Sequence, residues 1–338
     1  MGNSNLGQPA SSSLAISRRV VLGGLAGLSV VGSNAAAQTA YPDKPIRMIV
    51  PYAAGTGTDA IARRVAGGMQ EFIGQTVIVE NRPGGNAFIG TEAVARSSPD
   101  GYTLLMGTDH VMCFNPILFS KLPYDPIRDF TAVAGISTAS HILVVNADVP
   151  ARNLAELVAL AKSKPGALTI ASTNVGTPSH LAGELFQEEA KIKLTHVPYQ
   201  AAGQMFTDLL SGTVSMMFYP YQQLKPHLES GRIRALASGA RARTVWMPDL
   251  PTFAELGYSR TMMYAWFGIY APAGTPADRV SKLSEAIKQV LAKPEFAAAL
   301  TPVGMDVTYR PAADQIAFAA SEATRCKDVV QLSGVKLD

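Results

Sequence analysis

The stretch IVPYAAGTGTDAIARRVA, residues 49–66, decides the fold of this 338-residue chain. An apolar run over 46–50 predicts a strand, which passes through a loop rich in Gly, Ala and Thr into a helix. The helical residues that share one apolar face are Ile61, Val65, Met69 and Phe72. Thr58 or Asp59 is the expected N-cap of this helix. A strand that turns directly into a helix is the repeating unit of α/β folds.

The same alternation continues along the chain, where short β-branched runs are separated by longer stretches of helical periodicity. It predicts an α/β fold with mostly parallel sheets flanked by helices. The predicted strands are 46–50, 76–80, 102–106, 142–146, 168–172, 195–198, 214–218, 233–238 and 267–271. The chain is predicted to cross twice between two domains. The first domain then consists of residues 38–140 plus 268–338, and residues 141–267 are inserted as the second domain.

Residues 1–37 are predicted to be an export signal of the twin-arginine type, with the general secretory route as the alternative. Arg18 and Arg19 precede an uncharged run over 20–32, and three alanines end at Ala37. A membrane anchor is disfavoured because the run is shorter than the roughly 18 residues that a spanning helix requires. Cleavage after Ala37 predicts a periplasmic protein.

Charge and composition exclude several classes of function. The chain has 29 basic and 26 acidic residues, so removal of Arg18 and Arg19 leaves 27 against 26, a net charge of +1. This balance does not favour nucleic acid as a partner. The motifs of nucleophilic or metal catalysis are missing, so no catalytic residue, metal or cofactor is predicted. Cys113 and Cys326 are expected to be two buried thiols, or one disulfide if the C-terminus returns to the first domain.

The loop after residue 50 fails both common nucleotide-binding patterns. It lacks the lysine of a phosphate-binding loop and the third glycine of a dinucleotide fingerprint. Its amide groups at a helix N-terminus suit a small carboxylate, whereas the Asp59 carboxylate would repel a phosphate dianion. A second such loop follows the strand 168–172 and presents Ser172 through Thr177 ahead of a helix. For each loop, a turn with no ligand is the alternative.

The ordered motifs VPYAAGTGTD, SPDGYTLLMGT, HVPYQAAGQMFTDLLSG, LPTFAELGY and FGIYAPAGTP resemble the Bug family. Bug proteins are extracytoplasmic solute receptors of tripartite tricarboxylate transporters, and the resemblance runs from about Tyr41 to the C-terminus. It implies a two-domain Venus-flytrap fold, like type II periplasmic binding proteins, with no catalytic function and no cofactor. A small organic acid would bind in the cleft between the domains.

The resemblance also implies the ligand-binding residues. Those of the first domain are Tyr52, Ala53, Ala54, Gly55, Thr56, Gly57, Thr58, Asp59, Thr108 and Asp109. Those of the second domain are Ser172, Thr173, Asn174, Thr177, His180, Tyr199, Ala202, Gly203 and Tyr219. Tyr219 stands where the family often has aspartate, which disfavours ligands with an ammonium group and favours a monocarboxylate or aromatic carboxylate.

We therefore predict a monomeric periplasmic solute-binding receptor that delivers a small organic acid to the membrane subunits of a tripartite tricarboxylate transporter. Two alternative functions are consistent with the same sequence features. The loaded protein would signal to a membrane sensor kinase, or the chain would be an exported enzyme with a cofactor.

Overall fold

The structure, a computed structural model, describes residues 41–173 and 177–333. The predicted export signal of residues 1–37 and the predicted ligand residue Asn174 lie outside the described residues. Within the described ranges, no helix has the length and apolar character needed to cross a membrane.

The opening stretch forms the strand β1 (Ile46–Val50) and the helix α1 (Gly57–Ile73) as predicted. The N-cap prediction is wrong, because the chain turns at Gly55 (φ 83°) and helical geometry begins at Gly57. Thr56 is the N-cap, and its side chain accepts a hydrogen bond from the Asp59 N–H. Phe72 is 37% exposed and lies under the Lys293 ammonium, so the neighbouring Ile73 completes the buried face.

Two sets of parallel strands follow from the strand–helix units. In the first set, β1 pairs in parallel with β2 (Val77–Asn81) and β3 (Thr103–Thr108). In the second set, β5 (Thr169–Thr173) pairs in parallel with β6 (Thr195–Tyr199) and β7 (Met216–Pro220). In each set the carboxyl ends of the strands therefore meet at one edge of the sheet.

Helices connect these strands. The connecting helices and helical turns are α2 (Phe88–Ala95), η1 (His110–Phe114), α3 (Asn115–Leu118), α4 (Leu154–Ser163), α5 (Pro178–Ala190), α6 (Ala202–Leu210) and α7 (Tyr221–Glu229). The start of α4 shows why the sequence is helical there, because the Asn153 side chain accepts the Glu156 N–H at 2.9 Å.

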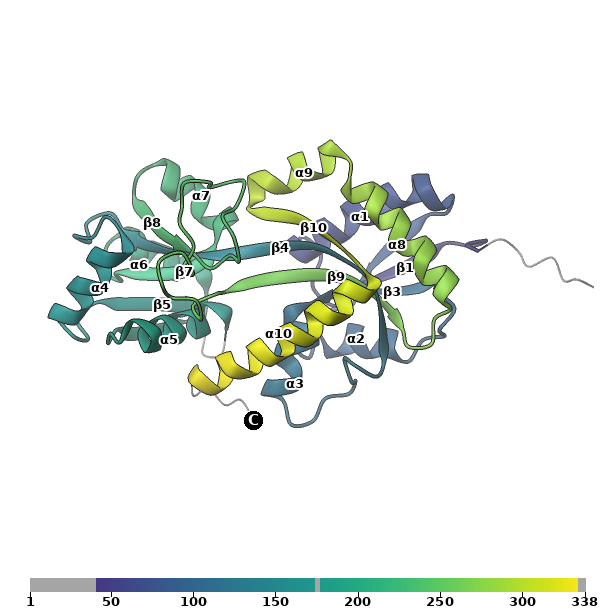
Figure 1. Ribbon diagram of the computed structural model, residues 1–338, viewed down its shortest axis with the longest axis horizontal. Coiled ribbons are helices and arrows are strands. Elements are labelled where there is room, and N and C mark those ends of the chain that lie inside the picture. Colours follow the sequence, from purple (N-terminus) through teal and green to yellow (C-terminus); the bar gives the residue numbers. More distant parts are fainter. Residues whose placement is uncertain (1–40, 174–176, 334–338) are drawn as a thin grey trace, which may run out of the picture. The chain divides into compact units, whose positions relative to one another are not determined.

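The long antiparallel strands β4 (Phe130–Asn146) and β9 (Tyr264–Pro272) join the two sets (Figure 1). Residues 130–140 of β4 pair with β9 and β10 (Met305–Pro311), whereas residues 141–146 pair with β7 and β8 (Ile233–Ser238). The α/β fold is confirmed. The sheet is mixed rather than mostly parallel, because four ladders among the described residues are parallel and five are antiparallel.

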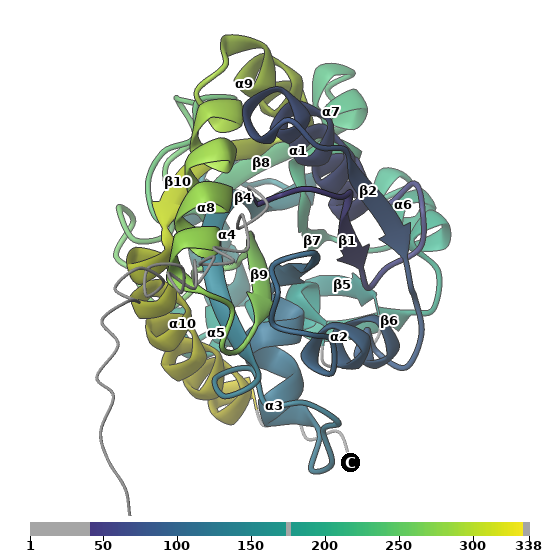
Figure 2. The same cartoon turned by 90° about the vertical axis from the view of Figure 1, so that its right-hand side faces the viewer.

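The C-terminal segment returns to the first set of strands. It consists of α8 (Ala277–Leu291), α9 (Pro294–Leu300), η2 (Thr301–Val303), β10 and α10 (Ala312–Ser333). Figures 1 and 2 show α8 near α1 and α10 alongside β4. Cys113 of η1 and Cys326 of α10 are free, buried cysteines of one apolar cluster, which agrees with the prediction of two buried thiols.

Candidate functional site

The first group of predicted ligand residues lies at the carboxyl edge of β1 and β3. The hydroxyl oxygens of Tyr52 and Thr108 are 2.8 Å apart, within hydrogen-bond distance. Parallel pairing of the two strands explains this contact, because it aligns Ile49 with Leu105 and brings both strand ends to one side. Burial raises the pKa of Tyr52, so its hydroxyl stays protonated and can donate a hydrogen bond.

Asp59 holds the loop of residues 52–59 in shape. Its carboxylate accepts hydrogen bonds from the Gly55 N–H at 2.9 Å, from Arg63 Nε at 3.1 Å and from Asn81 Nδ2 at 2.9 Å. Although burial opposes ionisation, these bonds keep the pKa of Asp59 below its usual range. Only 4% of Asp59 is exposed. Its charge is therefore satisfied within the protein.

The rest of this loop leaves hydrogen-bond donors for a ligand. Ala53 through Gly57 are exposed, and Thr58 is half-buried. The backbone N–H groups of Gly57 and Thr58 have no hydrogen-bond partner among the described residues, and they point from the N-terminus of α1. The partial positive charge of a helix N-terminus favours an anion at these groups. The Thr56 hydroxyl is less available, since it donates to the Ala53 carbonyl at 2.9 Å.

Asp109 differs from its predicted neighbours because it is buried next to charged groups of α10. It immediately follows Thr108, and only 5% of it is exposed. Burial raises its pKa to about 7, while the nearby Arg325 lowers it and Glu322 raises it. The raised pKa favours the protonated form of the Asp109 carboxyl, and this form can donate a hydrogen bond.

A second group of predicted residues gathers at the carboxyl end of β5 and the start of α5. Ser172 is fully buried, and its hydroxyl oxygen lies 2.7 Å from Nε2 of His196. The rings of His196 and His180 stack with their centroids 4.2 Å apart. Burial lowers the pKa of both imidazoles, that of His180 to about 4, so they are neutral at physiological pH.

Hydroxyl groups continue this second group toward α5. The Ser179 hydroxyl oxygen lies 3.1 Å from that of Thr177 and accepts the Thr173 N–H at 3.3 Å. Thr177 is the N-cap of α5 as predicted, with Pro178 at the first helical position.

Tyr199 and the start of α6 form the neighbouring part of the same edge. Tyr199 is the strand partner of Thr173, and its hydroxyl donates to Asp208 at 2.7 Å. Burial, together with this bond, raises the pKa of Tyr199 to about 12. Ala202 and Gly203 open α6, and their N–H groups have no hydrogen-bond partner in the described part of the chain. They are therefore donors of the same kind as those of α1.

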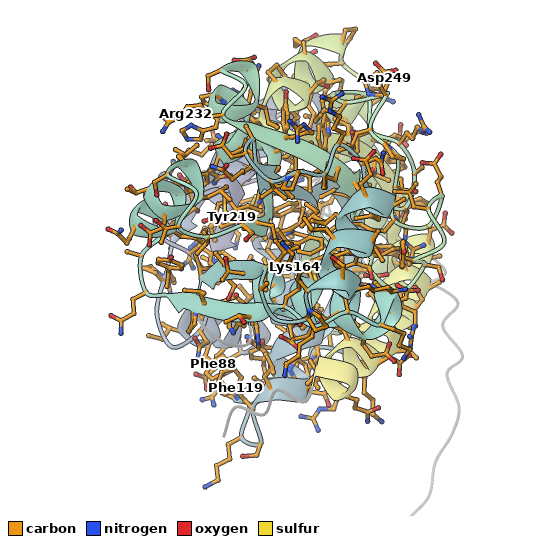
Figure 3. All side chains as sticks on the ribbon, turned by 90° about the vertical axis from the view of Figure 1, so that its left-hand side faces the viewer. Phe88, Phe119, Lys164, Tyr219, Arg232 and Asp249 are labelled. Carbon is orange, nitrogen blue, oxygen red and sulfur yellow. The ribbon has the colours of Figure 1, made fainter. Side chains whose placement is uncertain are left out.

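Tyr219 is the last residue but one of β7 and lies two residues before the start of α7 (Figure 3). Its ring packs edge-on against Phe206 of α6, with the centroids 5.2 Å apart. Burial raises the pKa of Tyr219, so this side chain offers a neutral hydroxyl where a carboxylate would carry charge.

The turn of Gly304 and Met305 contacts the start of α1 and the start of α7. A Cβ atom added at Gly57 would lie 3.3 Å from Met305 Cε, and one added at Gly304 would lie 2.6 Å from Tyr221 Cβ. The start of α1 and the start of α7 thus pack against one turn. Hydrogen bonds among the described residues connect the predicted residues within each group and not between the groups.

Three well-formed cavities lie elsewhere, and none of the predicted ligand residues lines them. The described residues also contain no cluster of three or more His, Cys, Asp or Glu side chains that could hold a metal ion.

Asn81 and His196 were not predicted, although both organise the candidate site. Asn81 donates to Asp59 and also to the Tyr52 carbonyl at 3.1 Å. Its position just after the predicted strand 76–80 was a usable signal, because polar residues at strand ends often face a ligand. The contact of His196 with Ser172 depends on the pairing of β5 with β6, which periodicity does not reveal.

Comparisons with known proteins identify the family of this chain. Residues 61–335 match the family described as the tripartite tricarboxylate transporter family receptor, TctC. The chain is 36% identical over 293 residues to the UPF0065 protein in the tcbD-tcbE intergenic region of Pseudomonas sp. strain P51, covering 86% of this chain and 87% of that protein. It is 34% identical over 298 residues to BugT of Bordetella pertussis, covering 88% and 91%.

Solved structures resemble the chain over most of its length. A periplasmic transporter structure has 34% identity and a TM-score of 0.73, covering 88% of this chain and 100% of that one. The structure of R. palustris Rpa4515 with adipate has 30% identity and a TM-score of 0.72, with the same coverage. MatC of Rhodopseudomonas palustris with bound malate has 30% identity and a TM-score of 0.68, covering 86% and 100%. The chain has the periplasmic binding protein fold, and it belongs to the tripartite tricarboxylate transporter receptor family, as its resemblance to the Bug proteins predicted.

Proposed function

We propose that this chain is a periplasmic receptor that captures a small organic carboxylate between its two groups of strand-end residues and delivers it to a tripartite tricarboxylate transporter. The observation that carries the proposal is the pair of helix N-termini, of α1 and α6, whose first N–H groups have no hydrogen-bond partner among the described residues. Both follow parallel strands, the arrangement in which α/β proteins bind ligands. Relatives that hold adipate and malate support a carboxylate as the ligand.

Backbone donors are strong enough for this task without a cationic side chain. Three charge-assisted hydrogen bonds contribute roughly 1.5 to 3 kcal/mol each, or about 4.5 to 9 kcal/mol in total. A micromolar dissociation constant corresponds to about 8 kcal/mol, so the range includes the affinity that a scavenging receptor needs. The loop of residues 52–59 is held in advance by Asp59, which reduces the entropy lost on binding.

The neighbouring side chains favour an acid over an amino acid. Tyr52 and Tyr219 supply neutral hydroxyls, since burial raises the pKa of both. The nearby carboxylates of Asp59 and Asp208 are already hydrogen-bonded within the protein. An ammonium group would therefore find few free acceptors, whereas a carboxylate would find several donors.

We infer that the two groups belong to separate domains, residues 38–140 plus 268–338 and residues 141–267. Closure would bend β4 and β9, which are the strands shared between them. A ligand drives closure only if it contacts both domains, because only a differential contact shifts a conformational equilibrium.

The proposal also includes export of the chain to the periplasm. Residues 1–37 would direct the chain to the periplasm and be removed after Ala37, and the mature protein would act as a monomer with the transporter membrane subunits as its partners. Intact-mass measurement of the protein from a periplasmic extract tests the cleavage, with Gln38 as the expected first residue. A first residue elsewhere would contradict this part of the proposal alone.

The binding proposal is tested by calorimetric titration of the mature, ligand-stripped chain. The panel would contain malate, adipate, succinate, benzoate, glutamate and glutarate, which is glutamate without the amino group, and thermal unfolding would show that the stripped protein is folded. At least one acid should bind with micromolar affinity, and glutamate should bind more weakly than the acid of equal length without the amino group. A folded protein that binds no acid, or that prefers the amino acid, would contradict the proposal.

Pull-down with a membrane fraction then identifies the partner, and recovery of a sensor kinase instead of transporter subunits would refute delivery to a transporter.

A further inference from the structure

A polar cavity of about 280 Å³ lies apart from the proposed carboxylate site. Its walls come from β4, β10, the start of β9 and the segment that follows β8. The polar side chains that carry the inference are Thr138, Ser140, Arg241, Arg243, Thr308 and Arg310. At roughly 30 Å³ for each water in the liquid, the cavity has room for a ligand the size of several water molecules.

Arg310 is the most unusual of these side chains, because its guanidinium group lacks an anionic partner. No hydrogen bond or ion pair joins it to any residue of the described ranges, and its Nη1 atom is buried. The group lies 3.8 Å from the centre of the Phe318 ring, which stabilises a cation but accepts no conventional hydrogen bond. Burial lowers the pKa of Arg310, and the nearby Arg241 adds to this effect. Arg310 is half-buried, and its buried Nη1 donor is costly to leave unpaired unless an anion or water satisfies it.

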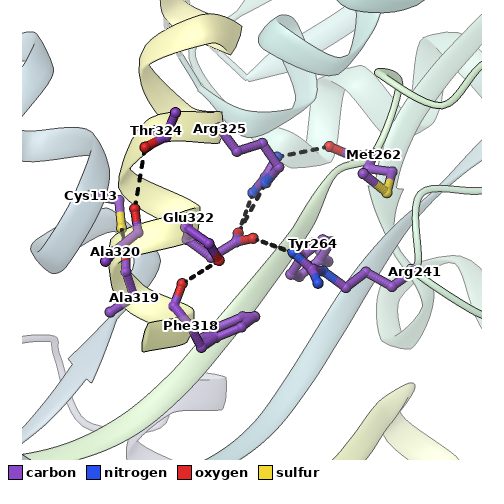
Figure 4. Close-up of polar contacts among 11 residues, drawn as sticks. Cys113, Arg241, Met262, Tyr264, Phe318, Ala319, Ala320, Glu322, Thr324 and Arg325 are labelled. Carbon is purple, nitrogen blue, oxygen red and sulfur yellow. Dashed lines mark hydrogen bonds and ion pairs between the residues drawn. The ribbon is translucent and has the colours of Figure 1, made fainter. Parts of the chain in front are cut away.

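Arg241, by contrast, is fixed in place at the cavity wall. It donates to the Tyr264 hydroxyl at 2.6 Å and to Glu322 at 2.9 Å (Figure 4). Glu322 also accepts from Arg325 of the same helix, so one carboxylate holds two guanidinium groups. Arg241 uses its Nε and one Nη2 donor in these bonds, and an arginine has five N–H donors in all. Donors therefore remain for a ligand.

Arg243 completes the cationic wall and is also held, by Glu255 at 2.9 Å. The lining contains one carboxylate, that of Asp306, against three guanidinium groups. Burial raises the pKa of Asp306, so this carboxyl becomes protonated, and therefore neutral, at a higher pH than an exposed carboxyl. The hydroxyls of the lining are neutral. That of Thr308 makes only a long hydrogen bond, 3.5 Å, to the Asp306 carbonyl, so these groups can donate to an oxyanion instead.

We propose that this cavity is a binding site for a small oxyanion, with Arg310 as its main cationic contact and Arg241 and the hydroxyls of Thr138, Ser140 and Thr308 as supporting donors. Carboxylate, phosphate and sulfate share this chemistry, since each presents several oxygen acceptors to a guanidinium fork. The site shares no residue with the proposed carboxylate site. The two proposals are therefore independent.

Calorimetric titrations of the mature chain with phosphate, sulfate and acetate, each at constant ionic strength in sodium chloride, test the inference. At least one oxyanion should bind saturably. Arg310→Gln should weaken that binding at least tenfold, whereas Arg128→Gln, which removes an exposed arginine elsewhere, should leave it unchanged. Comparison of the three anions shows which oxyanion the cavity prefers.

Two further variants separate the sites. Thr308→Val removes one supporting hydroxyl and should weaken binding about threefold even if Arg310→Gln folds poorly. Thr108→Val changes the proposed carboxylate site and should leave phosphate binding unchanged. The inference is overturned if no oxyanion binds saturably, or if Thr108→Val abolishes the binding while folded Arg310→Gln and Thr308→Val retain it. The latter result would leave the proposed receptor function intact.

Discussion

Asn81 donates a hydrogen bond to the Asp59 carboxylate at 2.9 Å, and its amide also reaches the Tyr52 carbonyl at 3.1 Å. One side chain thus fixes both ends of the loop between β1 and α1. The shape of the loop is thus set by side-chain hydrogen bonds within the protein.

Asn81→Ala should loosen this loop and weaken carboxylate binding about fivefold, which corresponds to roughly 1 kcal/mol for a hydrogen bond of this kind. Titration with the tightest acid of the panel measures the effect. Asn153→Ala is a matched control, because it removes an asparagine cap from α4 and should cost about 1 kcal/mol of stability without changing affinity. Equal affinity losses in both variants would show that the loop has no special role.

Tyr52→Phe should reduce carboxylate affinity by a similar factor, because the hydroxyl beside Thr108 is lost while the ring is retained. Tyr309→Phe is the control, since the Tyr309 hydroxyl also lies close to a hydroxyl, that of Ser284 at 3.0 Å. Comparable dissociation constants for Tyr52→Phe and the unmodified protein would remove Tyr52 from the site.

The stability of the protein should fall as the pH drops from about 6.5 to 4, and His141 should be one cause. Burial lowers the pKa of His141 from 6.5 to about 4, and its Nδ1 atom has no hydrogen-bond partner. Between these values the unfolded chain binds a proton that the folded chain does not, so acid favours unfolding. The contribution reaches about 2 kcal/mol at pH 5, because each pKa unit is worth 1.36 kcal/mol.

Urea unfolding at pH 7 and pH 5 measures this dependence. His141→Gln should lose part of the difference between the two pH values, whereas His227→Gln on α7 should keep it. An identical pH dependence in His141→Gln and the unmodified protein would contradict the assignment.

Glu322→Gln should destabilise the fold by about 3–5 kcal/mol, because Arg241 and Arg325 would lose the buried carboxylate that holds them. Denaturant unfolding measures the loss. Asp328→Asn on the exposed face of the same helix is the control and should change stability by less than about 0.5 kcal/mol. Unaltered stability of Glu322→Gln would mean that the network of Figure 4 is not a stabilising element.

Cys113 and Cys326 should not react with a thiol reagent in the native protein, and both should react after unfolding. Both are buried, and the neighbouring Cys326 together with burial raises the pKa of the Cys113 thiol, which removes the reactive thiolate. Counting reacted thiols with and without denaturant distinguishes the outcomes. Only a bridge would leave the unfolded, unreduced chain unreactive.

The strand–loop–helix units could be predicted from the sequence because their signals are local. The bounds of β1 and β8 agree with the apolar runs, and Asn153 marks the start of α4. Residues 130–140 of β4 could not be predicted as a strand, because Gly135, Ser137 and Ser140 interrupt the apolar pattern. The strand β10 was not predicted either. Pairing with β9, which is remote in sequence, stabilises this part of β4.

The candidate site could be predicted only in part for the same reason. The loops at the ends of β1 and β5 follow from glycines and hydroxyls beside helix starts, whereas the partners of their side chains depend on strand register. The predicted N-cap, Thr58 or Asp59, lies two or three residues after the observed N-cap, Thr56. The turn at Gly55 ends the loop earlier than the apolar spacing suggests. Asp109 faces charged groups of α10, a helix more than two hundred residues away, and no local pattern indicates that contact.

One half of β4 pairs with β9 and β10 and the other half with β7 and β8, so both parts of the sheet depend on this strand. If residues 130–140 melt, β9 and β10 lose their common neighbour, and the remainder of β4 loses the anchor that orients it toward β7 and β8. The chain should therefore denature as one cooperative unit, although its cavities and ligand groups are distributed along its whole length.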